Sequence, residues 1–126
     1  MSIPVPLAEL AETMTRYPLG YLLTVSEGER VHAVQAHPSV DGALLRVRRL
    51  GRRSLANAVE RPSVTLLWPP ADEGGYSLIV DGEAEAADDD LLVSPSRAVL
   101  HRAGAAPEQP SDSGACVSDC VEVPLS

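Results

Sequence analysis

The sequence predicts a small, mostly β protein, an antiparallel barrel or sandwich with a helix at its N-terminus and a short helix further along. The chain has 126 residues, the size of one domain. Its apolar segments are short and are separated by turn residues, as in "SEGE" and "PSVDG". Closing such strands into a barrel is one way to remove exposed sheet edges.

The first element predicted is an amphipathic helix over residues 6–17. Its apolar residues recur at spacings of three and four, which places them on one face of a helix. These residues are Leu7, Leu10, Ala11 and Met14. Pro18 then ends the helix, because proline cannot continue the backbone hydrogen bonding.

Six strands are predicted after this helix, in two groups of three. The first group lies at residues 19–25, 30–37 and 42–50. A short helix over residues 52–61 follows, because Ala56 and Ala58 favour helix and Pro62 prevents its continuation. The second group lies at residues 63–68, 75–86 and 91–102.

The C-terminal part differs in composition from the rest. Residues 1–102 form the predicted domain, and residues 103–126 are a predicted flexible linker and tail, rich in small and polar residues. Cys116 and Cys120 cannot form a disulfide framework, and a zinc site would need two further ligands. The three histidines contain no pair at zinc-finger spacing, so we expect no metal.

Charge and hydropathy exclude several classes of partner. The formal net charge of −8 should repel nucleic acid and anionic membranes. The N-terminus does not have the pattern of a signal peptide, and no apolar run approaches the ~20 residues of a membrane span. We therefore expect a soluble, cytoplasmic protein that binds neither nucleic acid nor membranes.

Five of the ten cationic residues, all of them arginines, lie between Arg46 and Arg53. If strand 42–50 alternates, Arg46 and Arg48 face away from Leu45 and Val47, and the cluster is partly a solvated strand face. Arg49 can be part of this solvated face in the same way. The start of the short helix is different, because unpaired N–H groups and the helix dipole favour an anion there.

Arg52, Arg53 and Ser54 lie at that helix start, directly after Gly51. Arginine can grip a phosphate through two parallel hydrogen bonds, which adds orientation to charge neutralisation. A hydroxyl beside it supplies a further hydrogen-bonding group. These three residues therefore predict a small phosphate site.

The order of these elements resembles the pyridoxamine 5'-phosphate oxidase-like split barrels, which include flavin- and deazaflavin-dependent reductases of actinobacteria. The resemblance covers about residues 7–102. In that family a basic turn leads into a short helix with an Asn-Leu-x-x-x-Pro end, and here Asn57, Pro62 and "SVTLL" match. The segment "YSLIVDGEAEA" is similar to the family's next strand. The implied fold is a six-stranded antiparallel split β-barrel.

The resemblance implies a homodimer with two flavins in clefts between the subunits. FMN, or the deazaflavin F420, would exchange hydride with a small organic substrate, and no dedicated catalytic base is required. Arg53 and Ser54, helped by Arg52, would hold the 5'-phosphate. The other candidate cofactor-binding residues are Arg46, Arg48, Asn57, Trp68 and Tyr76. Trp68 and Tyr76 would close the cleft from either subunit, and the alternative for Trp68 is packing at a strand end.

One departure from the family bears on the cofactor. The family's usual lysine falls at Ser54, so either Arg53 replaces that cation or the phosphate is held less tightly. F420 carries a polyglutamate tail that would need more cations than the chain has outside residues 46–53, which favours FMN. A non-catalytic flavin or tetrapyrrole carrier or sensor, and a dimeric scaffold without cofactor, remain as alternatives.

Overall fold

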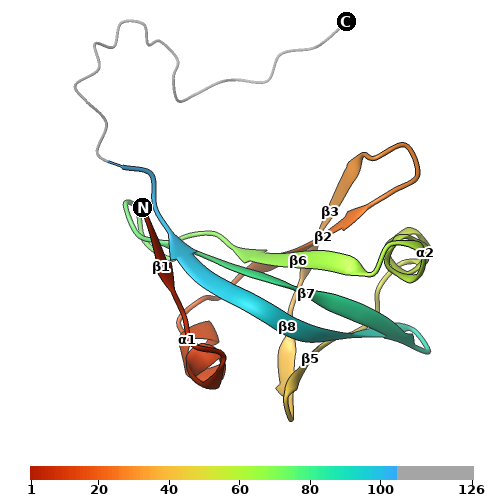
Figure 1. Cartoon of the computed structure of the whole chain (residues 1–126), viewed down its shortest axis with the longest axis horizontal. Helices are drawn as coiled ribbons and strands as arrows, with labels where there is room; N and C mark the ends of the chain where they lie inside the picture. Colours follow the sequence, from red (N-terminus) through yellow and green to blue (C-terminus); the bar gives the residue numbers. More distant parts are fainter. Residues whose placement is uncertain (105–126) are drawn as a thin grey trace, which may run out of the picture.

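The computed structural model describes residues 1–104, and these form one twisted antiparallel sheet with a short helix near each end (Figure 1). The predicted tail from residue 105 on, with Cys116 and Cys120, lies outside the described residues. The strands are β1 Ser2–Pro4, β2 Gly20–Val25, β3 Val31–Ala36, β4 Ser39–Asp41, β5 Leu44–Val47, β6 Ser63–Trp68, β7 Ser77–Ala87 and β8 Asp90–His101. The helices are a 3-10 turn at Leu7–Glu9, α1 at Leu10–Met14 and α2 at Arg52–Glu60.

The strand order is β3-β2-β6-β7-β8-β5-β4, and β1 also pairs with β8. The long strand β8 pairs with β7 along its length; on its other edge, Leu91–Val93 pair with β5 and Val99–His101 with β1. Among the described strands the order ends on β3 and β4, so the sheet is not closed. In Figure 1, β3 and β5 run at a steep angle to β7 and β8. The mostly β, split-barrel prediction is thus confirmed.

The six predicted strands correspond to β2, β3, β5, β6, β7 and β8, while β1 and β4 are additional strands of three residues each. The N-terminal helix is shorter than predicted. The amides of Thr15, Arg16 and Tyr17 bond to carbonyls three residues earlier, which tightens the last turn before Pro18.

The core lies on one face of the sheet, and the strand alternation selects its residues. Leu22, Leu66, Leu78, Val80, Leu91 and Val93 are fully buried. The register shifts between Asp81, which pairs with Arg97, and Gly82, which pairs with Pro95, so that Ser96 is the extra residue. A Cβ at Gly82 would lie 2.5 Å from the Ser94 carbonyl oxygen, so only glycine fits where the two strands approach at this bulge.

Helix α2 is fixed to the sheet by a buried polar contact. Ser54, Asn57 and Ala58 are its buried residues. The side-chain amide of Asn57 donates to the Thr24 hydroxyl at 3.1 Å, and Thr24 is 1% exposed. This contact positions α2 relative to β2. In the part of the chain that the structure describes, no helix is long and apolar enough to span a membrane.

Candidate functional site

The basic turn, residues 48–51, connects β5 to α2 and is held by the turn between β7 and β8. Arg49 has a left-handed backbone with φ 57°, and its N–H donates to Asp90 Oδ1 at 3.2 Å. The N–H of Leu50 donates to the Asp89 carbonyl oxygen at 3.2 Å. The backbone leading into α2 is therefore tied to a segment some forty residues later in the chain.

Arg46 has partners within the protein. Its guanidinium lies 3.0 Å from Asp41 Oδ2 and 3.0 Å from Asp90 Oδ2. Both hydrogen bonds raise the pKa of Arg46, and the bond to Asp90 has the larger effect. The Arg49 N–H and then the Arg46 guanidinium lower the pKa of Asp90. Arg46 thus links the β4–β5 hairpin to β8. Because two carboxylates already neutralise its guanidinium, it is poorly suited to bind an external anion.

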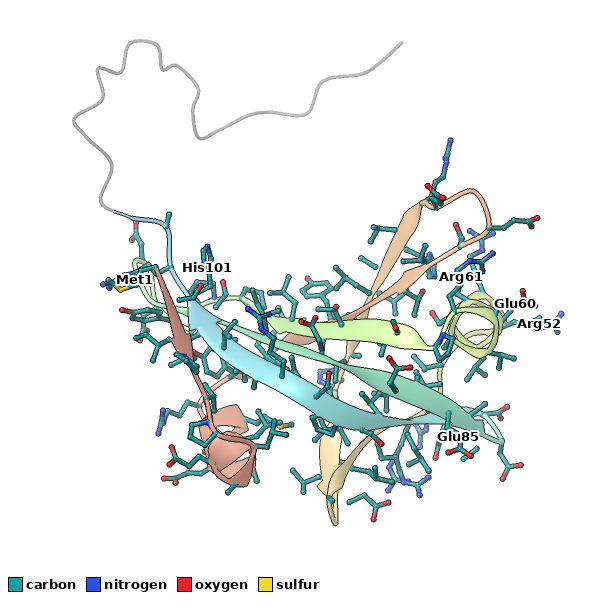
Figure 2. All side chains as sticks on the ribbon, in the orientation of Figure 1. Met1, Arg52, Glu60, Arg61, Glu85 and His101 are labelled. Carbon is teal, nitrogen blue, oxygen red and sulfur yellow. The ribbon has the colours of Figure 1, made fainter. Side chains whose placement is uncertain are left out.

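The start of α2 presents backbone N–H groups without a side-chain cap. The first backbone bond into the helix runs from the Leu55 N–H to the Gly51 carbonyl at 3.1 Å, so the N–H groups of residues 52–54 precede it. The first turn contains no acidic residue. Arg52 and Arg53 are exposed, and Figure 2 shows Arg52 projecting outward from α2. An anion at this point would meet both the helix dipole and two guanidinium groups.

Most arginines of the cluster have no carboxylate partner. Within residues 1–104 the ion pairs involve Arg46 and Arg97 only. The exposed guanidinium groups without a pair in this range include those of Arg48, Arg49, Arg52 and Arg53. Asp88 and Asp89 are the exposed acids of the adjoining β7–β8 turn. The surface at the start of α2 therefore has an excess of positive charge in an acidic protein.

The structure brings only some of the predicted site residues together. Arg52, Arg53 and Ser54 share the first turn of α2, and Arg48 precedes them in the basic turn. The Ser54 side chain is largely buried, with 2% exposure for the residue. Asn57 faces inward, toward Thr24.

Trp68 and Tyr76 lie at the other end of the sheet from α2. Ser63 begins β6 just after α2 and Trp68 ends it, a separation of about 17 Å at the usual rise of a strand. Tyr76 precedes β7; its ring lies under Arg102, and its carbonyl accepts the Tyr17 hydroxyl at 3.0 Å. These aromatics are therefore separate from the basic turn.

Two cavities lie among the described residues, and no arginine lines either of them. An apolar groove of about 600 Å3 runs between α1 and the β4–β5 hairpin and is bordered by Leu7, Leu10, Val40 and Leu44. A second cavity, of about 260 Å3, is bordered by Tyr17, Gly20, His37 and Trp68. Sequence reasoning did not find either cavity, because each forms between segments that only the tertiary fold brings together.

Two curated mycobacterial proteins are similar to this chain along almost its whole length. They are the uncharacterized proteins Mb0449c of Mycobacterium bovis and MT0457 of Mycobacterium tuberculosis. Each is 45% identical over 133 residues, covering 93% of this chain and 93% of the relative. No family model matches the sequence.

Among the solved structures with the same fold are three proteins whose names contain a cofactor or an enzyme. An F420 reductase has a TM-score of 0.59 at 20% identity, covering 75% of this chain and 98% of its own. The FAD binding protein of Mycobacterium smegmatis has a TM-score of 0.59 at 18% identity, with coverages of 81% and 100%. A putative pyridoxamine 5'-phosphate oxidase of Listeria innocua has a TM-score of 0.58 at 15% identity, with coverages of 75% and 96%. The predicted resemblance to split-barrel proteins is thus confirmed as a shared fold.

The Asp90 carboxylate should stabilise the fold in a pH-dependent way. Because its pKa is lowered in the folded state, its contribution is present above the ordinary value of about 3.9 and is lost as pH falls through the lowered value. Asp90→Asn should therefore lower the thermal midpoint at pH 7, and the difference from wild type should shrink toward pH 2. Circular dichroism melts across this range measure it.

The matched control is Asp89→Asn, which removes a neighbouring exposed carboxylate that makes no side-chain hydrogen bond within residues 1–104. It should leave the melting midpoint nearly unchanged at every pH. A constant difference between Asp90→Asn and wild type from pH 7 to pH 2 would contradict the role given to the carboxylate.

Proposed function

We propose that this chain, which belongs to the family of the mycobacterial proteins Mb0449c and MT0457 and has the split-barrel fold, binds a flavin-type cofactor by its phosphate at the start of α2. The observation that carries the proposal is the uncapped helix start, where N–H groups and exposed arginines occupy one surface. The names of the F420 reductase and of the FAD binding protein support a flavin-type ligand for this fold.

The residues at the start of α2 fit a phosphate. Arg52 and Arg53 would neutralise and orient it, the N–H groups of residues 52–54 would donate to it, and Arg48 would flank it. Ser54 is 2% exposed, so its part would be mainly its backbone N–H, one of these three donors. Arg46 and Asn57 are left out of the proposed site, because each already has a partner in the protein.

We propose that the ligand is FMN, with F420 as the alternative. We also propose that the protein is a cytoplasmic oxidoreductase that acts on a small organic substrate. A bound flavin supplies hydride transfer, while the protein supplies binding, orientation and electrostatics. The competing proposal is a non-catalytic flavin or tetrapyrrole carrier or sensor. Oxidation of NAD(P)H or of reduced F420 by the reconstituted protein, with any acceptor, favours the enzyme; binding without turnover favours the carrier or sensor.

Binding through the phosphate makes a direct prediction for the wild-type protein. FMN should bind at least about tenfold more tightly than riboflavin, which has the same ring system and no phosphate, because one charge-assisted contact is worth about 1.5–3 kcal/mol. Titration of both ligands followed by flavin fluorescence measures this ratio. Equal affinities, or no binding of either ligand, would contradict the proposal.

We further propose that the cofactor lies between two copies of this chain. The ring of a flavin held at α2 would need aromatic or apolar neighbours, and Trp68 and Tyr76 lie at the far end of the same protomer. A second copy could place its own partly exposed Tyr76 against the ring, whereas Trp68 is 3% exposed and packs at the end of β6. Leu7 and Val40, 47% and 46% exposed beside the apolar groove, are the kind of surface such an interface covers.

Assembly can be tested without any ligand. Light scattering should report a mass of about twice 13.3 kDa. Leu7→Glu should shift that mass toward the monomer, while Val59→Glu, at a residue 63% exposed on α2, should not. A wild-type monomer at micromolar concentration would contradict the shared cleft.

A further inference from the structure

The smaller of the two cavities combines walls that are part apolar and part polar with a nearly buried hydrogen-bond donor. Its volume is about 260 Å3, and it lies between α1 and the ends of β2, β3 and β6. Met14, Tyr17, Pro38 and Val40 contribute apolar surface, and no acidic residue, arginine or lysine lines it. Walls of this mixed character favour an uncharged ligand that has both an apolar body and a polar group.

The donor is the indole N–H of Trp68. Trp68 is 3% exposed, and its Nε1–H has no hydrogen-bond partner within residues 1–104. Among those residues no completely buried side-chain nitrogen lacks a partner, so this nitrogen keeps some accessible surface. Trp68 and Gly20 both line the cavity, which is where that surface opens.

Gly20 keeps the indole edge uncovered. A Cβ at this position would lie 2.9 Å from Trp68 Nε1 and 3.1 Å from Cδ1. Any side chain here would press on the ring atoms that border the cavity. The absence of a side chain at Gly20 thus leaves room for an outside acceptor near the indole nitrogen.

Because this N–H is accessible from the cavity and has no protein acceptor within residues 1–104, an acceptor that enters the cavity can bond to it. A ligand can supply the acceptor as well as apolar contacts. An apolar protein cavity of about 150 Å3 is known to hold benzene, so 260 Å3 accommodates one or two rings.

We propose that this cavity binds a neutral aromatic molecule of one or two rings whose carbonyl oxygen accepts the Trp68 indole N–H. The rings lie against Tyr17 and Pro38, and exposed His37 stands at the rim. No residue of the basic turn lines the cavity, so this site does not depend on the flavin proposal. A failure of FMN to bind would leave it standing.

The chain contains one tryptophan, so its indole N–H gives a single, readily assigned signal in a 15N-correlated NMR spectrum. On titration with indan-1-one, this signal should shift downfield until the shift saturates. The amide signals of Gly20 and Ala36 should shift over the same concentration range. Indane, the same bicycle without the carbonyl, should leave the indole proton without the downfield shift. The amides of Ala8 and Ala43, which border only the larger groove, are the internal control.

Trp68→Phe keeps an aromatic ring and removes the donor. This substitution should raise the Kd of indan-1-one about three- to tenfold and change the Kd of indane less than about twofold, as measured by calorimetry. Should this variant not fold, the wild-type comparison of the two probes decides. An indole signal that does not move with saturating indan-1-one, or that moves equally with indane, would overturn the proposal.

Discussion

Replacing Arg53 with alanine is expected to weaken FMN binding about ten- to a hundredfold and riboflavin binding much less. A charge-assisted hydrogen bond to phosphate is worth about 1.5–3 kcal/mol, and about 1.4 kcal/mol corresponds to a tenfold change in Kd. Arg53 is exposed in the first turn of α2 and has no ion pair within residues 1–104. The comparison with riboflavin separates loss of the phosphate contact from general damage to the fold.

The matched control is Arg16→Ala. Arg16 is an exposed arginine just after α1, which Figure 1 shows far from α2. Its loss changes the net charge by the same amount, so both flavins should bind within about twofold of wild type through screened charge alone. Arg46→Ala is a poorer control, because it removes two ion pairs. Equal losses of FMN and riboflavin in Arg53→Ala would contradict the phosphate contact.

Gly82→Ala is expected to destabilise the fold by about 1–3 kcal/mol or more, the usual range for overpacking a well-packed core. The added methyl group would lie 2.5 Å from the Ser94 carbonyl oxygen and 2.7 Å from Val93 Cγ1. Neither atom is the end of a flexible side chain, so the paired strands must separate at the bulge. Urea denaturation followed by circular dichroism measures the free energy of unfolding.

Gly104→Ala provides the comparison for that experiment. A Cβ at Gly104 meets no atom of residues 1–104 within 4 Å, so the free energy of unfolding should stay within about 0.5 kcal/mol of wild type. If Gly82→Ala unfolded at the same urea concentration as Gly104→Ala, the tight pairing of β7 with β8 at this point would be wrong.

The sequence was most informative where the signal is local. Strand β6 has the predicted limits, residues 63–68, because alternation and the preceding Pro62 both mark it. Helix α2 ends at Glu60, one residue before the predicted end. The strands β1 and β4 were missed, because three residues are too few to show alternation. Strand β1 also depends on a distant partner, β8, whereas β4 pairs with the next strand, β5.

In the candidate site, too, only the features formed by neighbouring residues could be predicted. Gly51, Arg52 and Arg53 are consecutive, so a basic helix start could be predicted from the chain alone. The neutralisation of Arg46 could not, because Asp90 lies 44 residues away. The inward contact of Asn57 with Thr24 likewise depends on how α2 packs on β2.

The measurement that tests the phosphate site most directly is the response of the α2 amides to FMN and riboflavin. In 15N-correlated NMR spectra, the backbone signals of Arg52, Arg53 and Ser54 should shift strongly with FMN and change little with saturating riboflavin, because only FMN carries the phosphate. Unchanged signals for these three amides with saturating FMN, or equal shifts with the two ligands, would contradict phosphate binding at the start of α2.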